Sequence, residues 1–224
     1  MVQYRKDELV NGECYHIYNR SIAGFVIFSS SEECQRMIEL IDILRFKNFN
    51  YQFSHFKKLS DKNQFIELEK LRIENKTLVD IVAYCIMPTH FHLIIRQNKN
   101  LGIIKYIAKI SNSYSKYFNT KHHRSGPLWS SRFKSVRVQD DEQLLHLTRY
   151  IHLNPVSANV VSNPFDWQFS SYKEYLEKTA SKICNYKNIL EIDPKKYKEF
   201  VNNRIDYQRQ LSAIKSLIIE NYAG

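Results

Sequence analysis

The residues best suited to chemistry are His90 and His92, which open an apolar stretch near the middle of the chain. They follow the corner Met87-Pro88-Thr89, with further apolar residues before it. Residues two apart on a β-strand point to the same face, so a strand here would set both imidazoles side by side and turn Phe91 into the core. Two neighbouring imidazoles can bind one divalent cation. Because the chain has eight histidines, chance alone gives about 0.3 such pairs per chain, and the spacing alone leaves an ordinary structural role open.

A second pair of polar side chains lies on the last turn of a predicted helix over residues 140–153 and directly after it. Tyr150 and Asn154 are four positions apart, so they project from one flank and can face the same site. The chain holds 15 tyrosines, so this spacing by itself proves nothing. Pro155 should end the helix, because proline lacks a backbone N–H and restricts the residue before it. His152 projects away from the Tyr150 flank and is expected to be a packing or solvent residue.

The charge balance favours a polyanionic partner. Lys and Arg number 33 against 23 Asp and Glu, which gives a net charge of +10 and a pI near 9.3. Nucleic acid is the first partner to consider and an anionic membrane surface the second, while a basic surface without function stays open. An apolar content of 43% with 13% aromatic residues is ample for a core and excludes a disordered chain.

Two basic segments follow the histidine pair. The first is a helix over residues 101–122, whose apolar stripe recurs at the helical period and whose opposite face carries lysines. The second is a loop over 121–129 followed by a strand over 132–138, a plausible surface for base stacking and phosphate contacts with single-stranded nucleic acid. A merely solvated face remains the alternative for the helix. The candidate DNA-binding residues are Lys105, Lys109, Lys116, Arg124, Trp129, Arg132 and Lys134.

Cysteine usage and hydropathy indicate the compartment. The four cysteines form no Cys-x-x-Cys pair, and three of them lie in apolar-patterned segments, where a free cysteine behaves as a small hydrophobe. No apolar run approaches the ~20 residues that span a bilayer, and the polar N-terminus is no signal peptide. We therefore expect a cytoplasmic protein, associated with the nucleoid of a bacterial cell, and no membrane insertion.

The elements that must position these residues follow an alternating order. Serines 29–31 offer N-caps for the first helix, residues 25–28 can continue the first strand, and a second helix is expected around 64–74. The main elements in order are a strand at 13–19, a helix to about 46, strands before and after the Met87-Pro88-Thr89 corner, the helix at 101–122, the strand at 132–138 and the helix at 140–153.

This order predicts an α+β fold. Its first six elements make the split βαββαβ pattern of a ferredoxin-like antiparallel sheet, with helices on one face and the tyrosine-bearing helix following. The aromatic loop at 165–172 should pack back on this body. Short helices at about 172–178, 194–203 and 204–220 would form a helical C-terminal extension. We therefore expect a catalytic domain over 1–175 and an extension over 176–224.

Four ordered motifs carry a resemblance to a known family. In order, they are Met87-Pro88-Thr89-His90-Phe91-His92-Leu93, Gly126-Pro127-Leu128-Trp129 through Arg132-Phe133-Lys134-Ser135, Arg149-Tyr150-Ile151-His152-Leu153-Asn154-Pro155-Val156, and Asp166-Trp167-Gln168-Phe169-Ser170-Ser171-Tyr172. Together they resemble the REP-associated tyrosine transposases, a branch of the HUH single-strand nucleases, over roughly residues 10–175. Two departures are Thr89, where an acidic or amide residue often stands, and Ser130-Ser131, where Glu-Gly is usual.

The resemblance implies a role for each matched residue. His90 and His92 would be paired metal ligands, Asn154 the third ligand through its amide oxygen, and Tyr150 the nucleophile. The metal would be Mg²⁺ or Mn²⁺. The implied activity is nicking and rejoining of single-stranded DNA through a 5′-phosphotyrosine, on hairpin-forming repeat DNA, by a monomer or homodimer.

Two other readings stay open. A domesticated nucleic-acid-binding protein of the same fold would share the basic surface without any chemistry. A zinc hydrolase built on His90 and His92 is weak, because no Asp or Glu stands beside them as base or third ligand.

Overall fold

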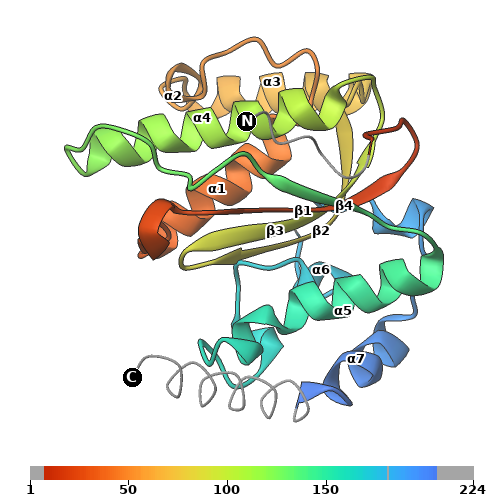
Figure 1. Cartoon of the computed structure of the whole chain (residues 1–224). Helices are drawn as coiled ribbons and strands as arrows, with labels where there is room; N and C mark the ends of the chain where they lie inside the picture. The colour runs from red at the N-terminus through yellow and green to blue at the C-terminus, as the bar shows by residue number, and fades with distance from the viewer. Residues whose placement is uncertain (1–7, 181, 206–224) are drawn as a thin grey trace, which may run out of the picture.

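The computed structural model describes residues 8–180 and 182–205, which form one antiparallel sheet with helices on both of its faces (Figure 1). The strands and α-helices in chain order are β1 (Cys14–Arg20), α1 (Ser31–Ile43), α2 (Phe53–Phe56), α3 (Asp61–Glu74), β2 (Val79–Met87), β3 (His90–Gln97), α4 (Gly102–Lys121), β4 (Lys134–Arg137), α5 (Asp141–Ser157), α6 (Tyr172–Tyr175) and α7 (Pro194–Asn202).

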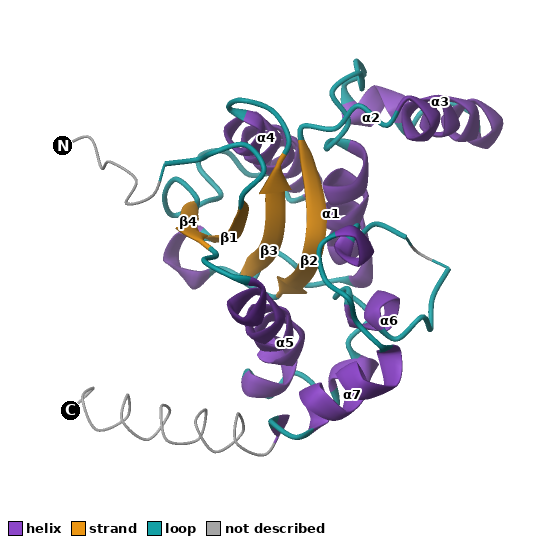
Figure 2. Cartoon of the chain, turned by 90° about the vertical axis from the view of Figure 1, so that its right-hand side faces the viewer, coloured by secondary structure: helices purple, strands orange, loops and turns teal. Residues whose placement is uncertain are grey.

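The sheet order is β2-β3-β1-β4, and every neighbouring pair is antiparallel (Figure 2). The strands that come first and third along the chain are therefore the two central neighbours. This is the topology of the predicted ferredoxin-like split βαββαβ sheet. The predicted fold class is confirmed.

Each face of the sheet has its own apolar core. On one face α1 and α4 pack over side chains such as Ile17, Phe91 and Leu93. On the other face α5 and the segment from α6 to α7 pack over Ala83 and Ile94. Because both faces are covered, β2 is apolar almost throughout instead of alternating with polar residues, and the middle of β3 is a continuous apolar run from Leu93 to Ile95. A polar side chain on these strands is therefore an exception that needs a reason.

A serine cap sets the start of α1. The Ser30 hydroxyl accepts a hydrogen bond from the Glu33 N–H, and the Glu33 carboxylate accepts from the backbone N–H groups of Ser29 and Ser30. This reciprocal capping box satisfies donors that the first helical turn leaves unpaired. The predicted cap is confirmed, although the helix ends at Ile43, a few residues earlier than expected.

The prediction that Pro155 ends the tyrosine-bearing helix is wrong. Helix α5 continues through Pro155 to Ser157. A proline removes a single N–H donor, and here the next turn still closes, since the Ala158 N–H donates to Asn154 O at 2.9 Å and the Val160 N–H donates to Pro155 O at 2.9 Å.

Two strand bounds also differ from prediction. Residues 25–28 do not continue β1, because the Phe25 N–H closes a turn onto Ile22 O and the Ile27 N–H bonds to Pro88 O. Strand β4 covers four residues instead of 132–138, since β1 offers it partners only from Tyr15 to Tyr18.

The aromatic loop at 165–172 packs back on the edge strand β2, as predicted. The Trp167 indole N–H donates to Ile86 O at 2.9 Å, and the Ile86 N–H donates to Phe169 O at 2.9 Å. Beyond it, α7 packs against α5. The helix expected at 204–220 lies almost entirely outside the described residues. Within the described ranges, no helix combines the length and apolar character that crossing a bilayer requires.

Candidate catalytic site

The site is built on the sheet face that α5 covers, where polar side chains replace apolar ones. In the antiparallel register, Arg20 of β1 lies opposite His90 of β3, and Tyr18 lies opposite His92. On its other side Tyr18 lies opposite Lys134 of β4. Residues paired across antiparallel strands share a face, so one continuous row of side chains forms here. We call this row the ladder; it consists of Arg20, His90, Tyr18, His92 and Lys134.

The histidine pair has the geometry that its spacing predicts. The imidazole centroids of His90 and His92 are 5.0 Å apart with their planes at 82°. Phe91 between them is fully buried in the opposite core, against Trp129. The strand pleat therefore delivers both rings to one side, and the expectation that they lie side by side is confirmed.

Each imidazole is held through its Nδ1 atom by a neighbour. The Thr89 hydroxyl lies 3.0 Å from His90 Nδ1, and His16 Nε2 lies 2.9 Å from His92 Nδ1. His16 also stacks on His92, with centroids 5.1 Å apart. Among the described residues, neither Nε2 atom of the pair has a hydrogen-bond partner. Both Nε2 atoms are thus left to bind something outside the protein.

Burial keeps these rings neutral. It lowers the pKa of His16 to about 4, and with a smaller effect of the Arg20 charge it lowers the pKa of His90 to about 4. The pKa of His92 is also held well below its usual range, by burial first and then by His16, His90 and Arg20. A neutral imidazole keeps a lone pair, which is the form that binds a metal.

Helix α5 brings Tyr150 to this face. Its ring meets those of His92 and His16 edge-on, at centroid distances of 6.0 Å and 6.3 Å, and 44% of its surface is exposed. One turn later the Asn154 amide donates its N–H to the Tyr150 carbonyl at 3.0 Å, so its own oxygen stays available. The phenol therefore lies beside the histidines and stays open to a ligand from solvent.

The other histidines of α5 face different neighbours. His152 is fully buried, with Nδ1 2.8 Å from the Tyr197 hydroxyl and Nε2 2.8 Å from the Ser171 hydroxyl. Its predicted packing role is confirmed. His146 contacts Arg149 at 2.7 Å and Phe200 of α7, which turns it toward the C-terminal segment.

The side chains on this face include donors that a divalent cation can use. Two imidazole Nε2 atoms and one amide oxygen would be neutral ligands, which would leave open positions and the full charge of the ion for a bound anion. No cluster of three or more His, Cys, Asp or Glu side chains suited to a metal exists within residues 8–180 and 182–205. A cation at this site would therefore need, besides the two histidines, the Asn154 amide oxygen and oxygen atoms of the bound anion.

The predicted DNA-binding residues separate into groups. Lys134 lies on the site face and is exposed, with Arg132 exposed just before the strand. Lys105, Lys109 and Lys116 lie on α4, which covers the opposite face of the sheet (Figure 1).

The loop residues Trp129 and Arg124 mainly contact protein. Trp129 packs among Phe28, Phe91 and Tyr114 and donates its indole N–H to Ser111 O at 3.2 Å, so much of its ring is taken up by the core. Arg124 lies over Phe118, at 5.9 Å from the ring centroid.

Three site residues were not predicted: His16, Tyr18 and Arg20. All three lie on β1 with a spacing of two, the same pattern that singled out the histidines of β3. Polar side chains at every second position of a central strand could have indicated from the sequence that β1 contributes to a site. Only the register with β3 shows that these side chains lie on the same face as His90 and His92.

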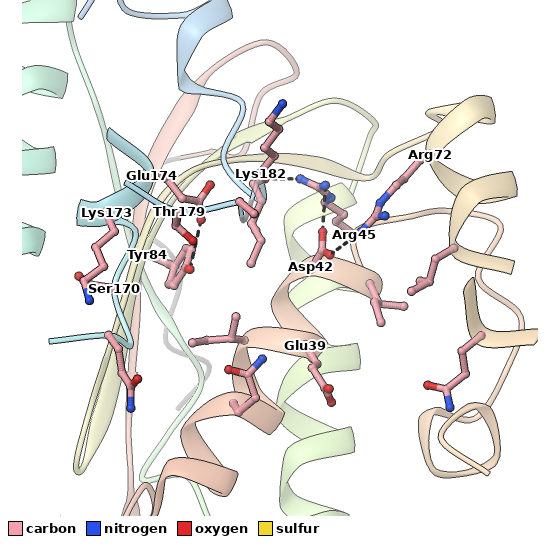
Figure 3. A pocket seen from close by; sticks show the side chains of 18 of the residues that line it. Glu39, Asp42, Arg45, Arg72, Tyr84, Ser170, Lys173, Glu174, Thr179 and Lys182 are labelled. Carbon is pink, nitrogen blue, oxygen red and sulfur yellow. Dashed lines mark hydrogen bonds and ion pairs between the residues drawn. The ribbon is translucent and has the colours of Figure 1, made fainter. Parts of the chain in front are cut away.

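A cavity of about 680 Å³ lies away from this site, between α1, α3 and the segment 168–183 (Figure 3). Its charged side chains largely satisfy one another: Arg45 and Arg72 approach Asp42 at 2.9 Å and 3.7 Å, and the Tyr84 hydroxyl donates to Glu174 at 3.2 Å. None of its lining residues belongs to the predicted site.

The fold and the site define a ferredoxin-like domain in which a tyrosine from a following helix faces a histidine pair on the central sheet. A family model and a relative confirm the resemblance to the REP-associated tyrosine transposases, and a solved structure supports the fold. A family model described as "Transposase IS200 like" matches residues 48–154, a range that contains His90, His92, Tyr150 and Asn154. The match also covers residues 48–78, which lie outside all four of the motifs.

A relative and a solved structure agree with this family. The "Putative REP-associated tyrosine transposase" of Haemophilus influenzae is 28% identical over 105 residues, which cover 42% of this chain and 58% of the relative. A REP-associated tyrosine transposase solved with a REP hairpin superimposes with a TM-score of 0.52 at 16% identity, over 86% of this chain and 99% of that one. At that identity the superposition supports the fold.

Proposed function

We propose that this protein nicks and rejoins single-stranded DNA, with Tyr150 as nucleophile and His90, His92 and Asn154 as ligands of Mg²⁺ or Mn²⁺. The observation that carries the proposal is the position of the Tyr150 phenol, edge-on to His92 and open to solvent. A phosphate bound at the Nε2 atoms would lie within reach of that phenol. The solved relative is bound to a REP hairpin, and we extend that substrate class, hairpin-forming repeat DNA, to this chain.

Each residue would have a distinct task. A cation at this site would withdraw charge from a non-bridging phosphate oxygen, which lowers the barrier to attack. Thr89 and His16 hold the two imidazoles in position through their Nδ1 atoms. The Asn154 amide N–H donates to the Tyr150 carbonyl. This hydrogen bond fixes the proposed metal ligand Asn154 relative to the helical turn that carries the nucleophile Tyr150.

The chemical step balances without an external energy source. The Tyr150 oxygen loses its proton and bonds to phosphorus, while the bond from phosphorus to the 3′ oxygen breaks and that oxygen takes up a proton. The products are a 5′-phosphotyrosine and a free 3′-OH. Reversal with another 3′-OH rejoins a strand, since one phosphodiester is exchanged for another.

The test is a covalent adduct. Labelled imperfect hairpins incubated with Mn²⁺ and the protein should yield a DNA-linked band in a denaturing gel. Tyr150→Phe should abolish the band while DNA binding persists, because only the phenol oxygen is lost. Adduct formation by this variant at the wild-type level would refute the assignment. Metal-insensitive binding without cleavage of any hairpin would favour the non-catalytic relative.

A further inference from the structure

A second hollow, of about 480 Å³, opens directly beside the histidine pair. Its lining includes Arg20, Thr89, His90 and Ser130. The hollow shares His90 with the proposed catalytic site, so a ligand that reaches the cation ligands also reaches this space. Its volume lies within the range of small-ligand pockets, about 300–1,000 Å³, and is ample for one nucleotide unit.

The walls of this hollow are fixed by backbone hydrogen bonds. The Ser21 N–H donates to Thr89 O at 2.8 Å, which ties the end of β1 to the corner before β3. The Ser130 N–H donates to Arg20 O at 2.9 Å, which ties the same strand end to the loop before β4. The space is therefore shaped by three segments that are joined to one another, and does not depend on the position of a single loop.

The charge of the hollow is positive. Arg20 is exposed, and no carboxylate occurs among the lining residues. In the part of the chain that the structure describes, no acidic group pairs with the Arg20 guanidinium. The guanidinium is also close enough to the histidines to contribute to lowering the pKa of both His90 and His92. An unpaired arginine next to hydroxyl groups of Thr89 and Ser130 has the chemistry of a phosphate site, since guanidinium binds phosphate through paired N–H donors.

We infer that Arg20 binds a DNA phosphate adjacent to the one that is cleaved. This inference rests on the proposed function, because it supplies that site with a second phosphate contact. The Arg20 side chain lies across the strand pair from His90, whereas Tyr150 approaches from α5 on the other side of His92. A strand bound in this way would run over the ladder with one phosphate at the histidines and its neighbour at Arg20.

The test measures phosphate contacts by salt dependence, without metal or cleavage. Binding of a labelled oligo-thymidylate of about 15 nucleotides is followed by fluorescence anisotropy in EDTA, between about 50 and 300 mM NaCl. Each phosphate contact on single-stranded DNA contributes about 0.7 to the slope of log K against log salt. Arg20→Gln should lower the slope by about 0.7 and weaken binding about three- to tenfold near 100 mM salt.

Two further variants define the result. Lys62→Gln removes the same charge from the exposed surface of α3 and should leave the slope unchanged. Arg20→Lys keeps the charge and should retain the slope. If Arg20→Gln and Lys62→Gln behave alike, Arg20 holds no phosphate and the inference is overturned. The proposed nicking activity is tested separately by the adduct assay, which depends on Tyr150. If Arg20→Gln lowers the salt slope but the wild-type protein forms no adduct, Arg20 binds a phosphate and the proposed nicking activity is rejected.

Discussion

His16 Nε2 lies 2.9 Å from His92 Nδ1, although the two residues are 76 positions apart in the sequence. One nitrogen must donate and the other accept. If His92 is to bind a cation through Nε2, its proton stands on Nδ1 and points at His16, which must then accept through Nε2. The contact is thereby compatible with the tautomer in which His92 can bind a cation.

Replacing His16 tests this relationship. His16→Leu should weaken Mn²⁺ binding by about 10- to 100-fold, because His92 loses the acceptor that orients it. His16→Gln should bind Mn²⁺ nearly as well as wild type, since a glutamine oxygen can take the place of Nε2. Isothermal titration calorimetry gives both affinities without DNA. His55→Leu, on α2, is the matched control, and an equal affinity of His16→Leu and this control would contradict the tautomer argument.

Tyr18 provides a control for the nucleophile. Its ring lies 6.0 Å from that of His92, the same centroid distance as for Tyr150. Tyr18 is partly buried on a central strand, whereas Tyr150 is 44% exposed on a helix. Tyr18→Phe should therefore still form the DNA adduct, and Tyr150→Phe should not. Mass spectrometry of the digested adduct should find the DNA on the peptide that contains Tyr150; finding it on Tyr18 would reverse the assignment.

The position of the lysines predicts unequal effects on DNA binding. Lys134 lies on the histidine face, while Lys105 lies on α4 beyond the opposite face of the sheet. Each side chain is exposed, so either substitution should leave the fold intact. Lys134→Gln should weaken binding of single-stranded DNA about three- to tenfold near 100 mM salt, and Lys105→Gln should have little effect. A larger loss for Lys105→Gln in the same anisotropy assay would place the DNA on the α4 side.

The buried His152 predicts a pH-dependent stability. Burial lowers the pKa of His152 to about 3, so between about pH 3 and 6.5 the unfolded chain binds a proton that the folded one excludes. Its contribution to the free energy of unfolding is complete above about pH 6.5 and falls by about 1.4 kcal/mol per pH unit below it. His152→Leu should cost about 1–3 kcal/mol at pH 7.5, because the Ser171 and Tyr197 hydroxyls lose a partner. Urea unfolding from pH 7.5 to 4.5 should show this difference shrinking, and a constant difference would contradict the argument.

Gly102 marks a close approach of α4 to the sheet. A Cβ atom at this position would lie 2.4 Å from Leu78 O, a backbone atom that cannot move aside cheaply. Alanine is the better helix former by about 1 kcal/mol, yet this gain should be smaller than the overlap costs. Gly102→Ala should destabilise the protein by about 1–3 kcal/mol in urea unfolding. A Gly102→Ala variant that is more stable than the wild type would show that α4 can move away from Leu78 O and would contradict this prediction.

The sequence correctly predicted those features that depend only on residues close together in the chain. The alternation of a strand predicted that His90 and His92 share a face with Phe91 opposite, and the serines at 29–31 predicted the start of α1. The helical period placed Tyr150 and Asn154 on one flank of α5. These predictions hold because side-chain direction within a strand or helix follows from its own backbone repeat.

The sequence by itself thus determined the fold class, the histidine pair and the helix that carries the tyrosine. The tertiary structure alone decided that His16, Tyr18 and Arg20 complete the same face, and that the lysines of α4 lie across the sheet from it. It also decided that α5 continues past Pro155. The physical reason is that the register between strands far apart in the chain, and the packing of a helix on one face or the other, depend on the whole core and on no single stretch of residues.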